Sequence, residues 1–132
     1  MPKPVAAKDY MCANLITFTP GMDILKAISL LIEKRISGGP VVDKQGNLVG
    51  VLSEKDCLKV ALHTSYHSES AGTVAEYMHT ETKTVDADTN IVDIASMFLR
   101  DDYRRYPVLK DGRLVGQISR HDVLKGLEGL WH

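Results

Sequence analysis

The chain carries two copies of one pattern, and this duplication constrains its fold more than any other feature of the sequence. Tyr10-Met11 returns as Tyr77-Met78, and Pro40-Val41 returns at the same spacing as Pro107-Val108. One residue is then lost in a turn. The later matches are Gly46-Asn47-Leu48-Val49-Gly50 with Gly112-Arg113-Leu114-Val115-Gly116, Ser53-Glu54-Lys55-Asp56 with Ser119-Arg120-His121-Asp122, and Leu58-Lys59 with Leu124-Lys125. The order and spacing of these matches predict two equivalent structural repeats.

Each copy predicts the same order of elements: strand, helix, strand, strand, helix. In the first copy, residues 15–19 form a short extended segment that ends at Pro20-Gly21, a turn signal. A helix follows in each copy, with Asp23 and its equivalent Asn90 as the expected N-caps. The apolar residues at helical spacing are Ile24, Ile28, Leu31 and Ile32 in the first copy, and Ile91, Ile94, Ala95 and Phe98 in the second.

A hairpin and a closing helix complete each copy. Two apolar, partly β-branched runs flank Lys44-Gln45-Gly46-Asn47, which predicts a hairpin turn, and the second copy turns more tightly through Asp111-Gly112. The closing helices are expected to start at Ser53 and Ser119. The predicted fold class is therefore mixed α/β (α+β), built from two βαββα repeats.

The two copies are joined by a polar stretch. Residues 64–73 lack apolar periodicity, so they are predicted to link repeat 1 (8–63) to repeat 2 (74–128). Each repeat has only about 60 residues, which is marginal for an independent core. We therefore expect the repeats to pack on each other with pseudo-twofold symmetry as one module.

Composition narrows the classes of function. The 132 residues are 44% hydrophobic and carry a formal charge of −1. This balance argues against a general binder of nucleic acid or of anionic membranes, which needs a basic face. The sequence has no signal-peptide run and no apolar run that would cross a bilayer. Its two cysteines, Cys12 and Cys57, form no disulfide framework, so the expected compartment is a reducing cytoplasm. Neither has a Cys-x-x-Cys partner, which predicts no structural zinc site.

The two copies resemble the CBS-domain family, named after cystathionine β-synthase. The residues that carry the resemblance are Pro40-Val41-Val42-Asp43 with the run from Gly46 to Asp56, and Tyr106-Pro107-Val108-Leu109 with the run from Gly112 to Asp122. The resemblance covers residues 8–127 and implies a tandem pair, or Bateman module. Such pairs bind adenine nucleotides or related adenosyl ligands in the cleft between the repeats. They regulate an attached or partner protein and often form homodimers.

The resemblance assigns the ribose of the ligand to Asp56 and Asp122, and it places Ser53 and Ser119 beside the ribose and phosphate. A helix start suits such a ligand, because its free N–H groups and positive dipole end favour a phosphate. A carboxylate one turn further on accepts hydrogen bonds from both ribose hydroxyls. The same Ser-x-x-Asp pattern is also close to a capping box, in which these residues only cap their helices. Both interpretations remain open on the sequence.

The adenine ring is expected near the start of each hairpin. Ser37-Gly38-Gly39-Pro40 offers bare backbone for the close approach of a flat base. The resemblance implies apolar walls from Ile16, Val41 and Val108. Alternatively, the two glycines only make a tight turn from helix to strand. The remaining candidates are Thr17 and its equivalent Thr84, with Tyr106 and Pro107 of the second hairpin.

A basic group occurs in the second copy. Arg104, Arg105, Arg120 and His121 are candidates for an anion clamp, because arginine presents a planar fork of donors. Alternatively, Arg104-Arg105 only compensates Asp101-Asp102. The pair equivalent to Arg120-His121 is Glu54-Lys55, which is nearly neutral. We therefore expect the site that uses Asp122 to hold phosphate better.

The chain is interpreted as a stand-alone energy sensor and not as an enzyme, because neither a nucleophile elbow nor a phosphate-binding glycine loop is present. The expected regulatory ligand is AMP, ADP, ATP or S-adenosylmethionine, with no required cofactor. The expected partners are an unidentified regulated protein and a second copy. The rival interpretations are an interaction module with a vestigial pocket, an enzyme that acts on nucleotides, and a nucleic-acid binder that rests on Arg104, Arg105, Arg113 and Arg120.

Three further features have ordinary explanations. His63, His67 and Glu69 have a spacing suited to a metal, but their place in a polar linker favours solvated histidines and no metal. Cys57 takes an apolar helix position and is expected to be a buried, inert thiol. An apolar set near the end of the sequence is assigned either to a dimer or partner contact or to packing on its own helix neighbours: Leu124, Leu127, Leu130 and Trp131.

Overall fold

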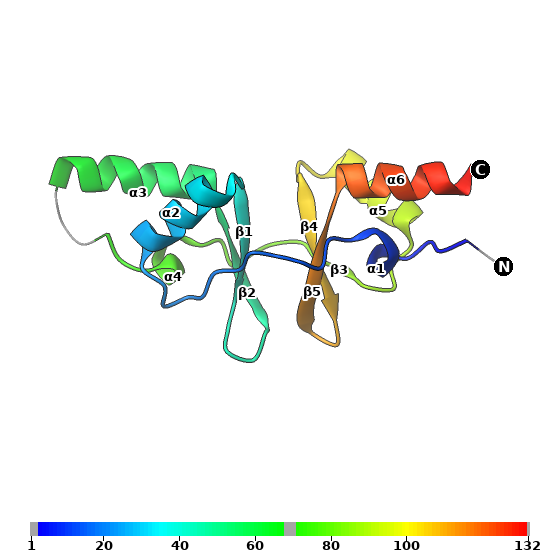
Figure 1. The fold of residues 1–132 in the computed structure, drawn as a ribbon, viewed down its shortest axis with the longest axis horizontal. Coiled ribbons are helices and arrows are strands. Elements are labelled where there is room, and N and C mark those ends of the chain that lie inside the picture. The colour runs from blue at the N-terminus through cyan, green and yellow to red at the C-terminus, as the bar shows by residue number, and fades with distance from the viewer. Residues whose placement is uncertain (1–2, 68–70, 132) are drawn as a thin grey trace. The chain divides into compact units, whose positions relative to one another are not determined.

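The computed structural model describes residues 3–67 and 71–131, without the side chains of residues 64–67 (Figure 1). The expectation about His67 and Glu69 therefore falls outside the described side chains. In chain order the elements are α1 (Ala7–Tyr10), α2 (Ile24–Lys34), β1 (Gly38–Val42), β2 (Leu48–Ser53), α3 (Glu54–His67), α4 (Val74–Tyr77), β3 (Val85–Asp86), α5 (Ile91–Arg100), β4 (Arg105–Lys110), β5 (Arg113–Ser119) and α6 (Arg120–Leu130). The predicted mixed fold of two βαββα-like repeats is confirmed. Helix α3 continues four residues into the segment predicted to be the linker.

The chain forms two compact units whose borders differ from those of the sequence repeats. The first-repeat unit is Ile16–Thr82, and the second-repeat unit combines Met1–Leu15 with Lys83–His132. Each unit therefore holds the hairpin and main helices of one repeat together with the leading segment of the other. The leading segments are residues 74–82, in the first-repeat unit, and Met1–Leu15, in the second-repeat unit. Ala7 of α1 is buried in the core of the second-repeat unit, and Val74 of α4 is buried in the core of the first-repeat unit.

Backbone pairing fixes these exchanged leading segments. His79 and Val51 exchange N–H···O bonds of 2.9 and 2.8 Å, and Cys12 and Gln117 exchange equivalent bonds of 2.8 and 2.9 Å. A glycine permits the approach in each case. A Cβ on Gly50 would lie 2.7 Å from the His79 carbonyl oxygen, and one on Gly116 would lie 2.8 Å from that of Cys12.

The strands form one small sheet in each unit. Strands β1 and β2 pair antiparallel, and the order β3-β4-β5 in the second-repeat unit places β3 parallel to β4. The first-repeat unit has a parallel bridge from Phe18 to Val41 where the second has β3. The tighter second turn is confirmed, with Asp111 and Gly112 both at positive φ (52° and 81°), as a two-residue hairpin requires.

The predicted starts of the first helices are also confirmed. The Asp23 carboxylate accepts a hydrogen bond from the Leu25 N–H at 2.9 Å, and the Asn90 side chain accepts one from the Val92 N–H at 2.8 Å. Helix α2 buries Ile24, Ala27 and Leu31, and α5 buries Ile91, Ile94 and Phe98. The apolar spacing read from the sequence thus marks the faces that these helices turn toward the core.

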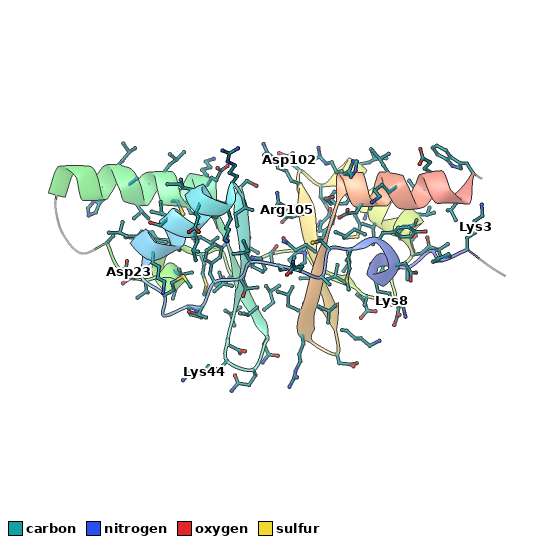
Figure 2. All side chains as sticks on the ribbon, viewed as in Figure 1. Lys3, Lys8, Asp23, Lys44, Asp102 and Arg105 are labelled. Carbon is teal, nitrogen blue, oxygen red and sulfur yellow. The ribbon has the colours of Figure 1, made fainter. Side chains whose placement is uncertain are left out.

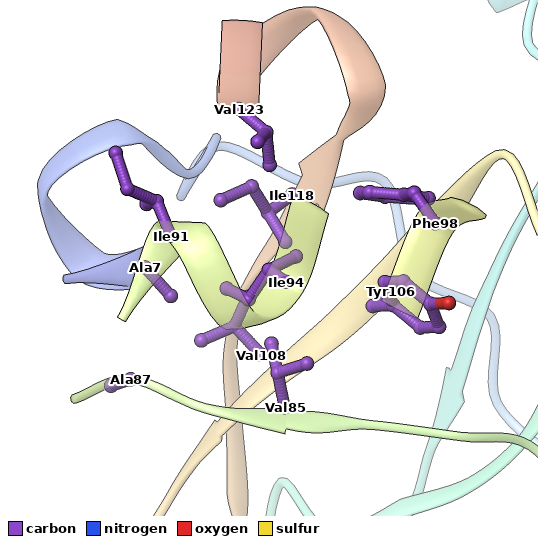
Figure 3. Close-up of a cluster of buried hydrophobic side chains, with 10 residues drawn as sticks. All are labelled: Ala7, Val85, Ala87, Ile91, Ile94, Phe98, Tyr106, Val108, Ile118 and Val123. Atoms are coloured by element: carbon purple, nitrogen blue, oxygen red, sulfur yellow. The ribbon is translucent and has the colours of Figure 1, made fainter. Parts of the chain in front are cut away.

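The two cores place their large aromatic ring at different positions of the repeat. In the first-repeat unit, Phe18 is fully buried, and a Cβ on Gly39 would lie 3.0 Å from its Cε2 atom. In the second-repeat unit the equivalents are Val85 and Tyr106, so the bulk has moved from the first strand to the second. The Tyr106 ring packs against Phe98 with a centroid distance of 4.5 Å (Figure 3). Gly39 therefore leaves room for the Phe18 ring and for the Ile16 carbonyl oxygen, which would lie 3.1 Å from the same Cβ.

We expect Gly39→Ala to lower the free energy of unfolding by about 1–3 kcal/mol, because the new methyl group overpacks against Phe18. The midpoint of urea unfolding measures this effect. Gly21→Ala is the matched control, since nothing lies within 4 Å of a Cβ at that position. A double-mutant cycle with Phe18→Leu should show that the smaller side chain recovers part of the loss. Equal stability of the Gly39 and Gly21 variants would contradict this account of the core.

Candidate functional site

The start of α3 is a capping box in which the Ser53 hydroxyl and both carboxylate oxygens of Asp56 are engaged. Asp56 Oδ2 accepts hydrogen bonds from the Ser53 backbone N–H at 3.1 Å and from the Ser53 hydroxyl at 2.7 Å. The Ser53 oxygen in turn accepts a bond from the Asp56 N–H at 3.3 Å. The other carboxylate oxygen, Oδ1, lies 2.8 Å from Nε2 of His79. Asp56 is 5% exposed and is the only buried charged residue in the described part of the chain.

The start of α6 has the same box but leaves two groups open. Asp122 Oδ2 accepts a bond from the Ser119 N–H at 2.9 Å, and the Ser119 oxygen accepts one from the Asp122 N–H at 3.2 Å. Within residues 3–67 and 71–131, Asp122 Oδ1 has no partner and the Ser119 hydroxyl has no acceptor. The Asp122 side chain is also half-buried instead of buried. This open oxygen and open hydroxyl lie at the N-terminus of an 11-residue helix, where backbone dipoles favour an anion.

Sequence reasoning missed His79, although the repeat contained a signal for it. His79 is the equivalent of Cys12, so the two copies differ in side-chain type next to a candidate aspartate. The Cys12 sulfur contacts the Asn14 carbonyl oxygen at 3.7 Å and makes no described contact with Asp122. Only the exchange of leading segments between the units reveals that position 79 reaches Asp56.

Gly38 and Gly39 lie in β1 and are explained by close contacts with β2 and with residues 16–18, so the proposed helix-to-strand turn at these residues is wrong. The left-handed residue that ends α2 is Arg35, with φ 54° and ψ 46°. Gly38 pairs with Ser53 in the hairpin, and a Cβ there would lie 2.5 Å from the Leu52 carbonyl oxygen. This pairing brings the expected adenine segment next to the start of α3, where the Glu54 N–H donates to the Ser37 carbonyl oxygen at 2.9 Å.

Several of the expected adenine contacts belong to the cores. Val41, Val108 and Tyr106 are fully buried in the hydrophobic clusters, because alternate residues of each hairpin strand face the helices. These three side chains are 0% exposed and therefore offer no surface to a ligand. Pro40 and Pro107 are buried beside them. Ile16 and Thr84 are half-buried, and Thr17 is exposed.

A hydrogen-bonded network holds Tyr106 in place. Its hydroxyl donates to Asp101 Oδ2 at 3.1 Å, and Lys83 Nζ lies 2.8 Å from Asp101 Oδ1. The bond from Lys83 lowers the pKa of Asp101 below its ordinary value. Burial, followed by the bond to Asp101, raises the pKa of Tyr106 to about 12. Lys83 therefore compensates the charge of Asp101, a role for which Arg104 and Arg105 were one alternative on the sequence.

The basic candidates of the second repeat are spread around the start of β4 and α6. Arg120 donates from Nη2 to the Tyr103 carbonyl oxygen at 3.0 Å, which ties the start of α6 to the loop before β4. Arg104 and His121 are exposed, and Arg105 is half-buried. Arg105 lies at the first position of β4 (Figure 2). The basic side chains that distinguish the second repeat therefore lie in the same unit as Asp122, whose Oδ1 atom is unpartnered among the described residues.

The first-repeat unit has an apolar hollow that sequence reasoning did not anticipate. It has a volume of about 380 Å³, lies between α2 and α3, and is lined by Ile28, Leu31, Ile32, Glu54, Cys57, Leu58 and Ala61. Cys57 is buried as predicted, and burial, reinforced by Asp56 and Glu54, raises its pKa to about 11. In the described part of the chain no three His, Cys, Asp or Glu side chains gather as metal ligands, and no helix there is long and apolar enough to span a membrane.

Comparison with known proteins identifies the class. A family model described as the CBS domain matches residues 7–63 and 74–129. The chain therefore belongs to the CBS-domain family, which confirms the resemblance carried by the two hairpins and their closing helices. Its two matches, in tandem, make it a CBS pair.

Individual relatives cover nearly all of this chain. The crystal structure of CBSX2, an Arabidopsis thaliana protein, in complex with AMP is 30% identical, with a TM-score of 0.82, and covers 98% of this chain and 100% of that one. The CBS pair of MJ0100, in complex with 5′-methylthioadenosine and S-adenosyl-L-methionine, is 26% identical, with a TM-score of 0.75 and coverage of 96% and 99%.

Curated relatives are longer than this chain. MJ1225 of Methanocaldococcus jannaschii is 28% identical over 94% of this chain and 43% of its own length. CBSX1 of Arabidopsis thaliana, a chloroplastic protein, is 30% identical over 85% of this chain and 58% of its own length. The chain thus spans about half the length of these two relatives.

We expect Ser119→Ala to lower the free energy of unfolding by about 1 kcal/mol, because the first turn of α6 loses its cap. Ser53→Ala should cost more, since it also removes a donor from the buried Asp56 carboxylate. Ser96→Ala is the matched control: Ser96 is exposed on α5 and donates only to the Val92 carbonyl at 3.3 Å. Urea unfolding measures all three. A Ser53 variant as stable as the Ser96 variant would contradict the assignment of these serines as caps.

Proposed function

We propose that this chain is a regulatory CBS pair that binds an adenosine-containing ligand and alters the activity of a partner protein. The ligand class is AMP, ADP, ATP or S-adenosylmethionine, and the first three would make the protein a sensor of adenylate energy. The role is one of binding, with no conversion of the ligand. Ligand binding would shift the protein between two conformations. The size of this shift cannot exceed the difference in the ligand's binding free energy for the two conformations.

The observation that carries this proposal is the open capping box of α6. Asp122 supports ribose recognition because its Oδ1 atom is unpartnered among the described residues, and a carboxylate oxygen accepts up to two hydrogen bonds. In the part of the chain that the structure describes, the Ser119 hydroxyl has no acceptor and can donate its proton to a ligand. The N-terminus of α6 also favours a phosphate. A residue that only capped the helix would need neither open group.

The relatives give independent support. CBSX2 was crystallised with AMP, and the CBS pair of MJ0100 with 5′-methylthioadenosine and S-adenosyl-L-methionine. These ligands share the adenosine group and differ beyond the ribose. They support an adenosine-reading site in this chain, in which we assign Asp122 as the ribose ligand.

We expect AMP to raise the melting temperature, and a hundredfold excess over Kd corresponds to about 2.7 kcal/mol of added stability. Asp122→Asn should lose most of this shift, because an amide oxygen keeps the cap but replaces one acceptor of the ribose diol with a donor. Differential scanning fluorimetry with AMP, ATP and S-adenosylmethionine measures the effect. Asp93→Asn, in the exposed first turn of α5, is the control. No shift with any of the three ligands would favour a ligand-free interaction module.

Exposed apolar side chains on the main helices support a homodimer as the working form. Leu99 is 90% exposed, Leu124 61% and Trp131 75%, whereas Leu127 and Leu130 pack against the core of their own unit. The end of the chain thus divides between the two roles considered for it. Burying these large exposed side chains against a second copy would remove apolar surface from water at a gain of about 25 cal/mol per Å².

We expect Leu99→Asp combined with Leu124→Asp to convert a dimer to a monomer in sedimentation velocity at micromolar concentration. Lys44→Asp, in the turn of the first hairpin, introduces the same side chain away from these helices and should leave the dimer intact. A wild-type protein that sediments as a monomer at all concentrations would contradict the dimer proposal.

The proposed compartment is the cytoplasm. Cys12 is exposed and free, and Cys57 is buried and free. Free thiols of this kind are typical of a reducing compartment.

A further inference from the structure

We propose that His79 closes the first-repeat site, so that the chain binds one adenosine ligand, at Asp122, and not two. This inference rests on the proposed function and assigns a residue that decides which of the two repeats is used. The imidazole of His79 takes the position on Asp56 that the ribose would take.

The geometry of Asp56 leaves no accessible acceptor. Oδ2 is engaged twice by Ser53 and Oδ1 is engaged by His79 at 2.8 Å. The Asp56 side chain is 6% exposed, while that of His79 is 62% exposed. The imidazole therefore lies between this carboxylate and solvent, and a ribose diol reaches Asp56 only if the ring moves away.

The Ser53 hydroxyl is also unavailable to a ligand. Its hydroxyl proton is committed to Asp56 at 2.7 Å, so it has no proton to donate to a phosphate or ribose oxygen. The equivalent Ser119 only accepts a hydrogen bond and keeps its proton free within the described part of the chain. Both polar groups of the Ser-x-x-Asp box are thus used up in the first repeat, and one oxygen and one proton remain open in the second.

The difference between the Oδ1 atoms of Asp56 and Asp122 traces to a single side chain, that of His79. His79 pairs through its backbone with Val51, five residues before Asp56, and Cys12 pairs with Gln117, five residues before Asp122. The two side chains therefore start from equivalent backbone positions. A thiol is too short and too weak a donor to replace the imidazole on the carboxylate. The repeats consequently offer a matched pair of exchanges, His79→Cys and Cys12→His.

The test is isothermal titration with AMP under reducing conditions, with the stoichiometry as the readout. Wild type should bind about one AMP per chain. His79→Cys should bind two, and the second should disappear in His79→Cys/Asp56→Asn. Cys12→His should lower the affinity of the wild-type site at least tenfold. His79→Gln, which keeps a donor near the same place, should remain at one. If His79→Cys shows no cooperative thermal transition and is therefore not folded, the titration is made with His79→Ala instead.

Several results would overturn this inference alone: one AMP per chain in both His79→Cys and His79→Ala, two in wild type, or loss of wild-type binding in Asp56→Asn. Loss of binding in the His79 variants would also overturn it, because His79 would then contact the ligand. If AMP binds to no protein of the series, the same titrations are made with ATP and with S-adenosylmethionine. Absence of binding of all three ligands in every protein would overturn the proposed function as well as this inference.

Discussion

The close approach of each leading segment to a hairpin glycine is the constraint on which the rest of this structure depends. Gly50 and Gly116 lack a Cβ where the neighbouring carbonyl oxygens of His79 and Cys12 need the space. The paired backbone bonds that result hold α4 in one unit and α1 in the other. The duplicated sequence therefore folds into units that each contain parts of both repeats. A substitution in one leading segment acts on the hairpin and closing helix of the other repeat.

Duplication has been followed by complementary change within each unit. Phe18 with Gly39, and Val85 with Tyr106, fill equivalent places with the large ring on opposite strands, because a close-packed core tolerates a volume change only when a neighbour compensates. Tyr106 brings a hydroxyl into the core, and Asp101 with Lys83 satisfies it. The two cores thus place a large ring at different positions of the repeat and lose residue-by-residue likeness.

Capping and ligand recognition draw on the same atoms in this fold. A Ser-x-x-Asp box whose oxygens and protons are all engaged stabilises a helix start and has nothing left for a ligand, as at Asp56. The same box with one oxygen and one proton open, as at Asp122, stabilises the helix and still offers an acceptor and a donor beside the helix dipole. The choice between cap and site is therefore decided by what surrounds the box. This explains why the identical spacing in the two copies left both interpretations open.

The sequence alone determined the duplication, the order of elements, the helix caps at Asp23 and Asn90, the tight turn at Asp111-Gly112 and the family, because local spacing and turn chemistry govern these features. Tertiary structure alone decided the rest. It placed the leading segment of each repeat in the other unit and buried Val41, Val108 and Tyr106 in the cores. It also paired Asp101 with Lys83, which lies 18 residues away in the sequence. It also brought His79 to Asp56, a contact between residues of different repeats. No local pattern encodes such contacts, because they arise only when backbone pairing joins segments that lie far apart in the sequence.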